Sequence, residues 1–281
     1  MAVMMGIKKY IKAAIAGAIR DGLNGDSELR RQLIALQEQI KHENEENRLN
    51  DLYLSLPGQV LDFFYRGQKI KFFLPNANID GIQKQILRTK TFYEVAFLEK
   101  LYEYIKDKKG VAIDAGANIG NHSLFFSKVC NFSSCYAIEP NPAVSHILQR
   151  NIEINDLDAK VHRISKGISS ENSHMFLGVS PQDNLGATKL QKEGFIGTEI
   201  DVIALDQLDL KDVDLIKIDL EGMAVEALIG AEKTIAQNQP VLFVELFDDE
   251  FKEGQTFLAK LGYELKCSLP WGNYIFTRAA E

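Results

Sequence analysis

The sequence GVAIDAGANIGNHSLFF, residues 110–126, has the composition of a ligand-binding turn. Asp114 ends a short apolar run, and Gly116 allows the chain to turn sharply and to approach a ligand closely. Asn118 is expected to cap the helix that follows, and Gly120 to let that helix pack closely. A strand, a turn and a helix in this order form the ligand-binding edge of many parallel sheets.

The spacing of the two glycines excludes two common phosphate-binding loops. A dinucleotide fingerprint needs G-x-G-x-x-G, whereas Gly116 and Gly120 are four apart and follow an acid that would repel a pyrophosphate. This also argues against an NAD-dependent dehydrogenase. A P-loop needs Gly-Lys-Ser/Thr, which does not follow.

Glu139, in CYAIEPNP, ends the next apolar run, where an acid can hydrogen-bond both hydroxyls of a ribose. A ribose-binding acid, a second acid at Asp114 and the lack of a phosphate loop suit a nucleoside with a cationic tail. S-adenosylmethionine has this chemistry. A generic strand–turn–helix unit with a chance glutamate is the alternative.

A second group of charged residues lies about 100 residues later, in VDLIKIDLEGMAVEALIGA. Lys217 and Asp219 alternate along an apolar strand, so they point to one face, as does Glu221 if the strand continues. Glu245, in LFVELF, is expected at the same edge. Buried strands seldom carry three charges at one end without a use, although a structural ion pair between Lys217 and Asp219 is the alternative.

Methyl transfer to oxygen or nitrogen requires alignment, exclusion of water and removal of a proton from the acceptor. Asp219 and Glu221 are the first candidates for the base, followed by His122 at the start of the helix after the turn. Lys217 is expected to orient an acidic partner or to lower its pKa. Asp219, Glu221 and Glu245 could instead hold a divalent cation, but no spacing demands one, and we expect none.

Five motifs occur in the order and approximate spacing of one enzyme family: IDAGANIGNHS, YAIEPNP, NIEIN, DLIKIDLEGM and VLFVEL, over roughly residues 90–247. The chain therefore resembles the FkbM family of S-adenosylmethionine-dependent methyltransferases. The resemblance implies a class I methyltransferase sheet of seven strands with a reversed terminal strand. It also implies a sugar or polyketide hydroxyl as acceptor, with amide nitrogens of ribosomal peptides as the second acceptor class.

The resemblance extends the expected site. Lys166, Gly167 and Ile168, just past the third strand, are expected to flank the adenine. Asn184 and Gly186 correspond to family residues near the active site, so they are expected to contact the acceptor together with Glu245. The residues expected to bind S-adenosylmethionine, or S-adenosylhomocysteine as product, are Asp114, Gly116, Asn118, Gly120, Asn121, His122, Glu139, Pro140, Lys166, Gly167, Ile168 and Asp219.

One position departs from the family pattern, which resembles I-D-x-E-G-x-E. The chain has Ala224 where the pattern has its third acid. Glu221 and position 224 are three apart at the start of an expected helix, so they would share a face towards the cleft. Either the natural enzyme works without this acid, or the chain is an engineered inactive variant. A non-catalytic scaffold that binds S-adenosylmethionine is a further alternative.

Alternating strands and helices must position these residues. The pattern indicates an α/β fold with a doubly wound, mostly parallel, Rossmann-like sheet. Two strand-like segments, YELKCS and NYIFTRA, close the chain around an LPWG turn and predict an antiparallel pair at one edge. The other expected strands are 111–115, 134–139, 160–165, 213–219 and 240–246, and the expected helices are about 118–129, 142–154, 223–236 and 249–261.

The N-terminal part is expected to be helical. Apolar residues recur every three or four positions over 7–20, which predicts a helix that packs on the domain, on a second copy or on a membrane surface. About two heptads follow from Leu29, so a helical hairpin or a homodimer contact is expected. Later, a hairpin is expected at 59–74 and a helix at 91–107. The expected segments are 1–54 (helical), 55–108 (hairpin and helix) and 109–281 (methyltransferase domain).

The composition is that of a globular protein, with 281 residues, 46% of them hydrophobic and 25% charged. A net charge of −7 argues against a general nucleic-acid binder, which needs a basic surface, and leaves a small molecule, glycan or peptide as acceptor. Cys130, Cys135 and Cys267 fit no metal motif and are expected to be free thiols in a reducing, cytoplasmic compartment. No apolar run reaches about 18 residues, so no membrane span is expected.

Overall fold

The computed structural model describes residue 16 and residues 27–178, 190–191 and 197–279. The expected helix at 7–20, apart from Ala16, and the expected acceptor residues Asn184 and Gly186 lie outside the described residues. The chain divides into two compact units, Met1–Ser55 and Leu56–Glu281.

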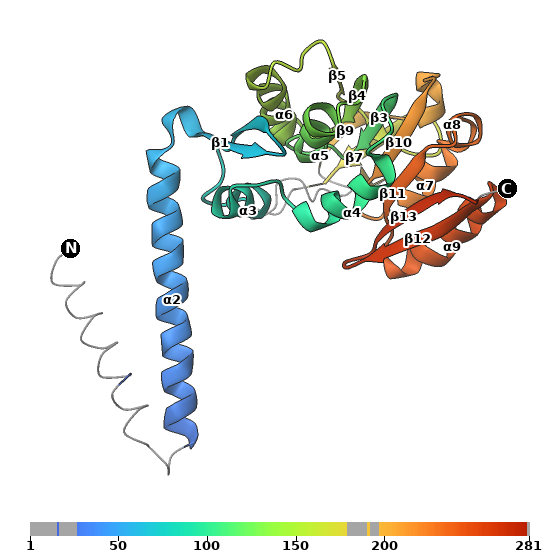
Figure 1. The fold of residues 1–281 in the computed structure, drawn as a ribbon. Helices are drawn as coiled ribbons and strands as arrows, with labels where there is room; N and C mark the ends of the chain where they lie inside the picture. Colours follow the sequence, from blue (N-terminus) through green and yellow to red (C-terminus); the bar gives the residue numbers. More distant parts are fainter. Residues whose placement is uncertain (1–15, 17–26, 179–189, 192–196, 280–281) are drawn as a thin grey trace. The chain divides into compact units, whose positions relative to one another are not determined.

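The described part of the first unit is dominated by one long helix, α2 (Ser27–Ser55) (Figure 1). It covers the residues in which about two heptads were expected, so the helical prediction is confirmed over this range. Ile34, Leu36 and Leu54 are exposed on it. Within the part of the chain that is described, no helix combines the length and the apolar character needed to cross a membrane.

The second unit begins with the expected hairpin. Strands β1 (Val60–Tyr65) and β2 (Gln68–Phe73) pair antiparallel. The turn residues Arg66 and Gly67 have φ of 46° and 77°, the left-handed values that match the twist of a two-residue hairpin. Asn151 and Asn155 hydrogen-bond the main chain of β2 and so fix the hairpin to the rest of the unit.

Seven strands form the central sheet, in the order β12-β13-β11-β10-β3-β4-β5. All neighbours are parallel except β13, which is antiparallel to both β11 and β12. The last strand of the chain is therefore the reversed one, and the predicted seven-stranded sheet is confirmed. The strands are β3 (Val111–Ala115), β4 (Ser134–Ile138), β5 (Val161–Ile164), β10 (Val213–Ile218), β11 (Val241–Glu245), β12 (Tyr263–Leu269) and β13 (Asn273–Arg278).

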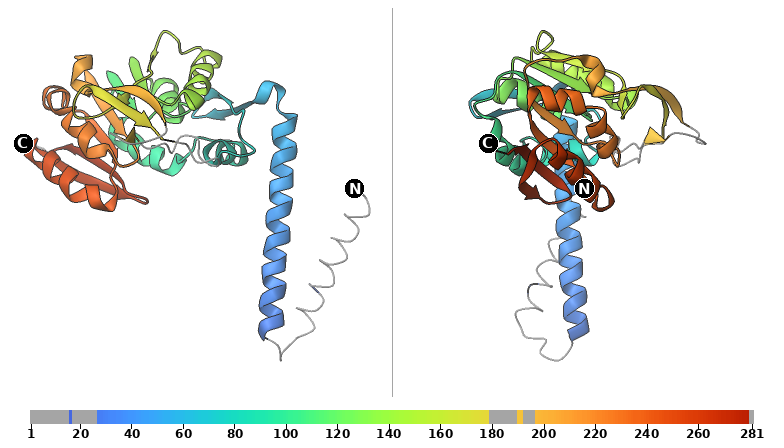
Figure 2. Two further views of the ribbon diagram at one scale, coloured as in Figure 1. Left: turned by 180° about the vertical axis from the view of Figure 1, so that it is seen from behind. Right: turned by 90° about the vertical axis from the view of Figure 1, so that its right-hand side faces the viewer.

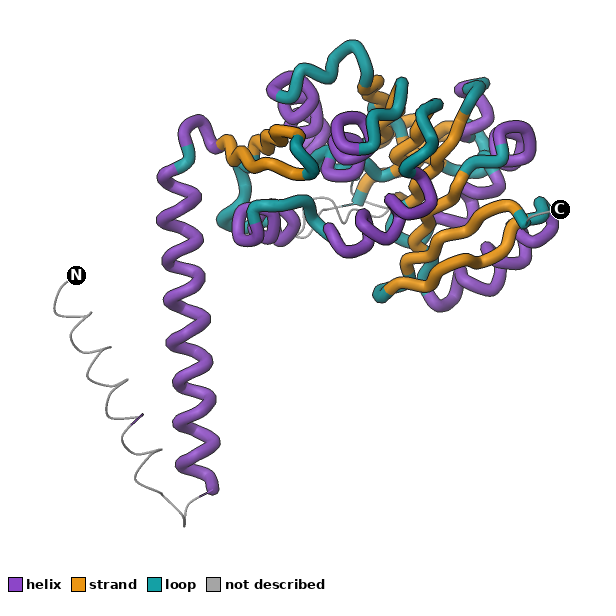
Figure 3. The backbone as a smooth tube through the Cα atoms, viewed as in Figure 1, coloured by secondary structure: helices purple, strands orange, loops and turns teal. Residues whose placement is uncertain are grey.

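Helices lie on both faces of this sheet, as a doubly wound fold requires (Figure 3). On one face, Ile113 and Ile216 belong to a buried apolar cluster with residues of α7, α8 and α9. Because side chains alternate along a strand, Asp114 and Lys217 point to the other face. The helices are α3 (Gly81–Thr89), α4 (Val95–Ile105), α5 (Asn121–Leu124), α6 (Pro142–Ile154), α7 (Ala224–Ile229), α8 (Glu232–Asn238) and α9 (Asp248–Lys260), with short 3₁₀ turns η1 (Pro57–Gln59) and η3 (Leu205–Leu208).

The helix after the glycine turn begins at Asn121, three residues later than predicted. Gly116, Asn118 and Gly120 have φ of 80°, 49° and 90°, so the chain is still turning there. The prediction that Asn118 caps the helix is wrong, because Gly120 precedes α5. The close packing expected at Gly120 is confirmed, since a Cβ there would lie 2.7 Å from a methyl of Leu148. A π-helical segment, η2 (Phe125–Val129), follows α5.

Two further elements differ from the prediction. The single helix expected at 223–236 is divided into α7 and α8 at Gly230, which lies against the main chain of Ser169, where a Cβ would overlap the carbonyl oxygen. The link between β5 and β10 contains a second sheet, ordered β6-β9-β7-β8 (Figure 2). Its strands are β6 (Gly167–Ile168), β7 (Ser173–Leu177), β8 (Leu190–Gln191) and β9 (Thr198–Ile203). All three cysteines are free, as predicted.

Candidate active site

Two adjoining pockets lie at the carboxyl ends of β3, β4 and β10. They share Gly116, Glu139, Asp219 and Glu221, so they are two parts of one cleft. The narrow part has a volume of about 40 Å³ and the wide part about 240 Å³. Beyond the shared residues, the narrow part is lined by Ile138, Pro140, Asn141, Lys166, Gly167, Ile168, Leu177 and Leu220, and the wide part by Ile82, Tyr93, Glu94, Asn118, Glu245, Trp271 and Asn273.

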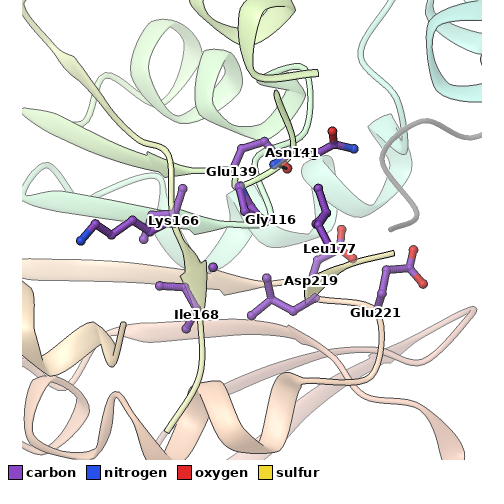
Figure 4. Close-up of a pocket in the computed structure, with 12 residues that line it drawn as sticks. Gly116, Glu139, Asn141, Lys166, Ile168, Leu177, Asp219 and Glu221 are labelled. Atoms are coloured by element: carbon purple, nitrogen blue, oxygen red, sulfur yellow. Dashed lines mark hydrogen bonds between the residues drawn. The ribbon is translucent and has the colours of Figure 1, made fainter. Parts of the chain in front are cut away.

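The narrow part has mainly apolar walls (Figure 4). Lys166, Gly167 and Ile168, which were expected to flank an adenine, line it. The Lys166 side chain extends away from the pocket, and its Nζ lies 3.6 Å from Asp201 on β9. Leu177, at the end of β7, was not predicted, because its strand was not recognised in the sequence.

Glu139 forms part of the wall of both pockets. Its Oε2 accepts the main-chain N–H of Asn118 at 2.9 Å, and its Oε1 accepts that of Asn141 at 2.8 Å. Burial raises the pKa of Glu139 to about 7, although these two hydrogen bonds oppose the shift. A carboxylate offers about four acceptor positions, so each oxygen retains capacity for a further donor.

Behind the cleft, the buried ammonium group of Lys217 contacts both the glycine turn and Asp219 in the cleft wall. Nζ of Lys217 lies 3.2 Å from Asp114 Oδ1 and 3.3 Å from Asp219 Oδ2. It also donates to the carbonyl oxygen of Gly116 at 2.7 Å. The side chains of Asp114 and Lys217 are 0% and 2% exposed, whereas Asp219 is 40% exposed and faces the cleft. Only Asp219 of this trio can therefore meet a ligand.

Two neighbouring carboxylates keep the side chain of Lys217 protonated. Burial alone would lower the pKa of Lys217, but Asp219 and Asp114 raise it above its ordinary value. The ion pair that the sequence offered as a structural alternative is thus present. This ion pair does not exclude a further role for Lys217, because the same amine also holds the main chain of the glycine turn.

Asp219 and Glu245 form a hydrogen-bonded pair of acids in the wide part of the cleft. Burial opposes ionisation of Asp219, but Lys217 and the hydrogen bond from Glu245 hold its pKa below the ordinary value. Burial and the charge of Asp219 raise the pKa of Glu245 to about 9. The two acids are therefore coupled and share one proton at neutral pH.

Several predicted ligand residues lie behind the cleft wall instead. His122 is only 6% exposed and packs against Phe126 and Phe243. Burial, together with Lys217, lowers its pKa to about 4, so it is neutral near pH 7. The expectation that His122 lies at the ligand edge is therefore wrong. The predicted ligand residues that line neither pocket are Asp114, Gly120, Asn121 and His122.

Asn121 acts on the main chain rather than on the cleft. Its Oδ1 accepts the N–H of Tyr93 at 2.9 Å, and its Nδ2 donates to the Tyr93 carbonyl oxygen at 3.1 Å. This double contact ties the segment before α4 to the start of α5. Asn121 thereby fixes the position of Tyr93 and Glu94, two cleft residues that the sequence analysis did not identify.

Ala224 does not share a face with Glu221, contrary to the prediction. Glu221 precedes the helix with a left-handed φ of 46°, and α7 begins only at Ala224. The Ala224 side chain is 1% exposed and belongs to the apolar cluster, while its N–H donates to Glu250 at 3.0 Å. Position 224 therefore lies in the core and lines neither pocket.

An Ala224→Glu variant is consequently expected to lose stability. Its carboxylate would enter an apolar cluster, which costs at least about 2 kcal/mol without a partner. Ile229→Glu, on the same helix and 41% exposed, is the matched control and should stay close to wild type. Urea unfolding measures both. An A224E protein as stable as I229E, with higher methyl transfer than wild type, would contradict this placement.

The wide part of the cleft contains five residues that the sequence analysis missed: Ile82, Tyr93, Glu94, Trp271 and Asn273. Four of the wide part's lining residues have a left-handed main chain without being glycine, namely Glu94, Asn118, Glu221 and Trp271. Strained conformations of this kind concentrate at functional sites. No local pattern in the sequence signals them.

Among the described residues, no group of three or more His, Cys, Asp or Glu side chains is arranged to hold a metal ion. This includes Asp219, Glu221 and Glu245, which the sequence analysis considered as a cation site.

Comparison with known protein families decides the class of this molecule. The Methyltransferase FkbM domain matches residues 114–265, a range that runs from the glycine turn to β12 and includes Asp219, Glu221 and Glu245. The chain belongs to the FkbM methyltransferase family. The predicted family is thus confirmed. The cleft residues that lie outside the matched range are Ile82, Tyr93, Glu94, Trp271 and Asn273.

Individual FkbM and methyltransferase relatives are distant. Methyltransferase 1 of Beauveria bassiana is 25% identical over 212 residues, which are 66% of this chain and 84% of that protein. Methyltransferase sdnD of Sordaria araneosa is 22% identical over 182 residues, 52% of this chain and 70% of that protein. The crystal structure of Methyltransferase FkbM from Methylobacillus flagellatus KT is 18% identical, with a TM-score of 0.46. That alignment covers 72% of this chain and 56% of the solved one.

Proposed function

We propose that this FkbM methyltransferase transfers a methyl group from S-adenosylmethionine to a hydroxyl of a sugar or polyketide-type acceptor. One observation carries the proposal: a narrow apolar pocket and a wide acidic pocket meet at Gly116, Glu139, Asp219 and Glu221. Such a junction suits a donor whose adenosine end is apolar and neutral and whose sulfonium end is cationic.

The residues of the cleft fit S-adenosylmethionine, which supplies an electrophilic methyl group when bound. Ile168 and Leu177 offer apolar walls for the adenine. Glu139 retains acceptor capacity for the ribose hydroxyls, and Gly116 lies at the junction of the two parts, where the amino-acid tail is expected. Asp219, ionised and partly exposed, attracts the cationic centre.

The wide part of the cleft is suited to the acceptor. Its walls orient the attacking atom, exclude part of the solvent and offer carboxylates as proton acceptors. Asp219 and Glu221, the first candidates for the base from the sequence, line both parts of the cleft, and Glu94 is a further carboxylate available to accept the proton in the wide part. Lys217 supports them from behind by holding Asp219 and the glycine turn in place.

A Glu139→Gln variant is expected to bind S-adenosylhomocysteine about tenfold to a hundredfold more weakly than wild type. Loss of hydrogen bonds to a charged acceptor costs about 1.5–3 kcal/mol, which corresponds to this range. Isothermal titration calorimetry measures the change. Glu153→Gln, on the exposed side of α6, is the matched control and should bind as wild type does.

The same titration, followed by an assay of methyl transfer to hydroxyl and amide acceptors, separates the proposed function from its alternatives. Binding of NAD instead of S-adenosylhomocysteine would favour a dehydrogenase and overturn the proposal. Tight binding of S-adenosylmethionine without turnover on any hydroxyl or amide acceptor would favour a non-catalytic scaffold. Turnover confined to peptide amides would replace the hydroxyl acceptor by the second acceptor class.

For the N-terminal unit, we propose a contact role. Ile34, Leu36 and Leu54 on α2 are exposed apolar side chains of a helix that is otherwise mostly polar. They support a contact with a second copy or with a peptide acceptor. Free cysteines support a reducing compartment such as the cytoplasm.

A further inference from the structure

The acceptor end of the cleft combines one large aromatic surface with polar groups and has no basic side chain among its lining residues. Its volume of about 240 Å³ lies below the roughly 300–1,000 Å³ of pockets that enclose drug-sized ligands. It therefore has room for one small ring. This inference rests on the proposed function, because it concerns the acceptor for the same methyl transfer.

Trp271 provides the aromatic surface. It lies in the turn between β12 and β13 with a left-handed φ of 57°, and it is 75% exposed. Phe97 of α4 packs against it, with ring centroids 5.6 Å apart, and so supports the indole from the protein side. An exposed indole that is supported from behind by a second ring offers a flat apolar face on which a ligand ring can stack.

Glu94 provides the polar end. It precedes α4 with a left-handed φ of 53°, a conformation that is sterically costly for any residue with a Cβ. Asn121 fixes the neighbouring main chain, and the Tyr93 phenol hydrogen-bonds the Glu94 carboxylate. The carboxylate is thereby oriented in the cleft on the side of the acceptor.

Among the described residues, the wall carries acids but no basic side chain, so it disfavours an anionic ligand. Lys217 lies behind Asp219, but it also pairs with the buried Asp114 and so does not neutralise the wall. Burial and the charge of Asp219 raise the pKa of Glu94 to about 7, so this group can both accept and carry a proton near neutrality. Tyr93, whose pKa rises to about 12 mainly through burial, stays a donor throughout.

We propose that the wide part of the cleft is a subsite for one neutral saccharide ring, which stacks on Trp271 and presents the reacting hydroxyl to Glu94. In the reaction, the hydroxyl oxygen forms a bond to the methyl carbon while the carbon–sulfur bond breaks. The sulfonium becomes a neutral thioether, and the hydroxyl proton moves to the Glu94 carboxylate. Neutral sugars match this subsite because their axial C–H faces are apolar and their hydroxyls donate to carboxylates.

Trp271 is the only tryptophan in the chain, so its fluorescence reports directly on this subsite. The experiment titrates the full-length protein, saturated with S-adenosylhomocysteine, with methyl glycosides of neutral hexoses, 6-deoxyhexoses and pentoses. We expect a saturable change in fluorescence with at least one of them. Glucuronate and glucose 6-phosphate, which carry negative charge, should give no saturable change.

Two variants separate the roles of the wall residues. Trp271→Phe removes the reporter, so its sugar binding is measured by calorimetry, and Trp271→Ala is expected to weaken it by about tenfold or more. Glu94→Gln should bind the sugar nearly normally but lose about 10²–10⁴ in kcat on it. Glu103→Gln, exposed on the same helix, is the matched control and should change neither.

A readout other than activity follows from the pKa of Glu94. Because its folded-state pKa is raised from 4.5, the folded protein gains stability while Glu94 is protonated and loses it as the pH rises from about 4.5 to 7. The melting temperature of E94Q should therefore rise relative to wild type across this window. The other charged groups around Glu94 are Asp219, Lys217, Glu139, Glu221 and Glu245, and they are common to both proteins.

Three results would overturn the proposal. One is the absence of a saturable change with every neutral glycoside although S-adenosylhomocysteine binds. The second is stronger binding of a cationic amine without a sugar ring, such as spermidine. The third is an E94Q protein with unchanged kcat. Failure of S-adenosylhomocysteine to bind would instead reject the proposed function itself, so the two failures are distinguishable.

Discussion

A Gly116→Ala variant is expected to lose S-adenosylmethionine binding and much of its stability. Gly116 has a φ of 80°, and a Cβ there would overlap the main-chain carbonyl oxygen of Asp219 on the neighbouring strand end. The carbonyl is main chain and cannot rotate away, so β3 and β10 would have to separate where the two pockets meet. We expect at least a hundredfold loss of affinity, or about 2.8 kcal/mol.

Gly67→Ala provides the matched control for this substitution. Gly67 has nearly the same left-handed φ, 77°, but no atom lies within 4 Å of its added Cβ. It should lose only the conformational cost of about 1–2 kcal/mol and keep normal ligand binding. Urea unfolding and calorimetry with S-adenosylhomocysteine measure both proteins. Equal behaviour of G116A and G67A would refute the idea that close approach at the glycine turn forms the cleft.

Replacing Lys217 with methionine is the second change with a large expected effect. The variant leaves the Asp114 carboxyl group, which is 0% exposed, without its cation, and it frees the carbonyl oxygen of Gly116. Removing one partner of a buried ion pair costs about 3–5 kcal/mol. Because the same amine holds Asp219, donor binding should fall together with stability, as measured by urea unfolding and calorimetry.

The double variant Asp114→Asn with Lys217→Met tests the cause. It removes the buried negative charge as well, so part of the lost stability should return, and the two changes should be non-additive. Lys211→Met, which breaks an exposed pair with Asp209, is the control and should cost less than about 1 kcal/mol. A double variant no more stable than K217M would mean that packing, and not charge pairing, explains the loss.

The sequence was sufficient to predict the sheet and the strand ends that form the cleft. Alternation of apolar runs and helices located β3, β4, β10 and β11 to within about a residue, and strand periodicity correctly put Lys217 and Asp219 on one face. The sequence could not show which of the charged residues are exposed and which are buried. Asp114 and His122 are buried because β10 and β11 cover them, and these strands follow about a hundred residues later.

The acceptor side of the cleft escaped prediction for a related reason. Glu94 and Trp271 are 177 positions apart in the sequence and meet only through the packing of α4 against the β12–β13 turn. Both residues have a left-handed main chain. Glutamate and tryptophan rarely adopt this conformation, so the sequence does not predict it. Ala224 was misplaced because it was expected to share a helical face with Glu221, whereas Glu221 and Gly222 belong to a left-handed turn and the helix begins only at Ala224.

The most direct test of the central claim is a crystal structure of the full chain with S-adenosylhomocysteine. We expect the adenine in the narrow part beside Ile168 and Leu177, the ribose hydroxyls on Glu139, and the sulfur at the junction facing the wide part. Adenine density in the wide part, against Trp271 and Glu94, or ligand density outside the cleft would contradict this assignment of the two pockets.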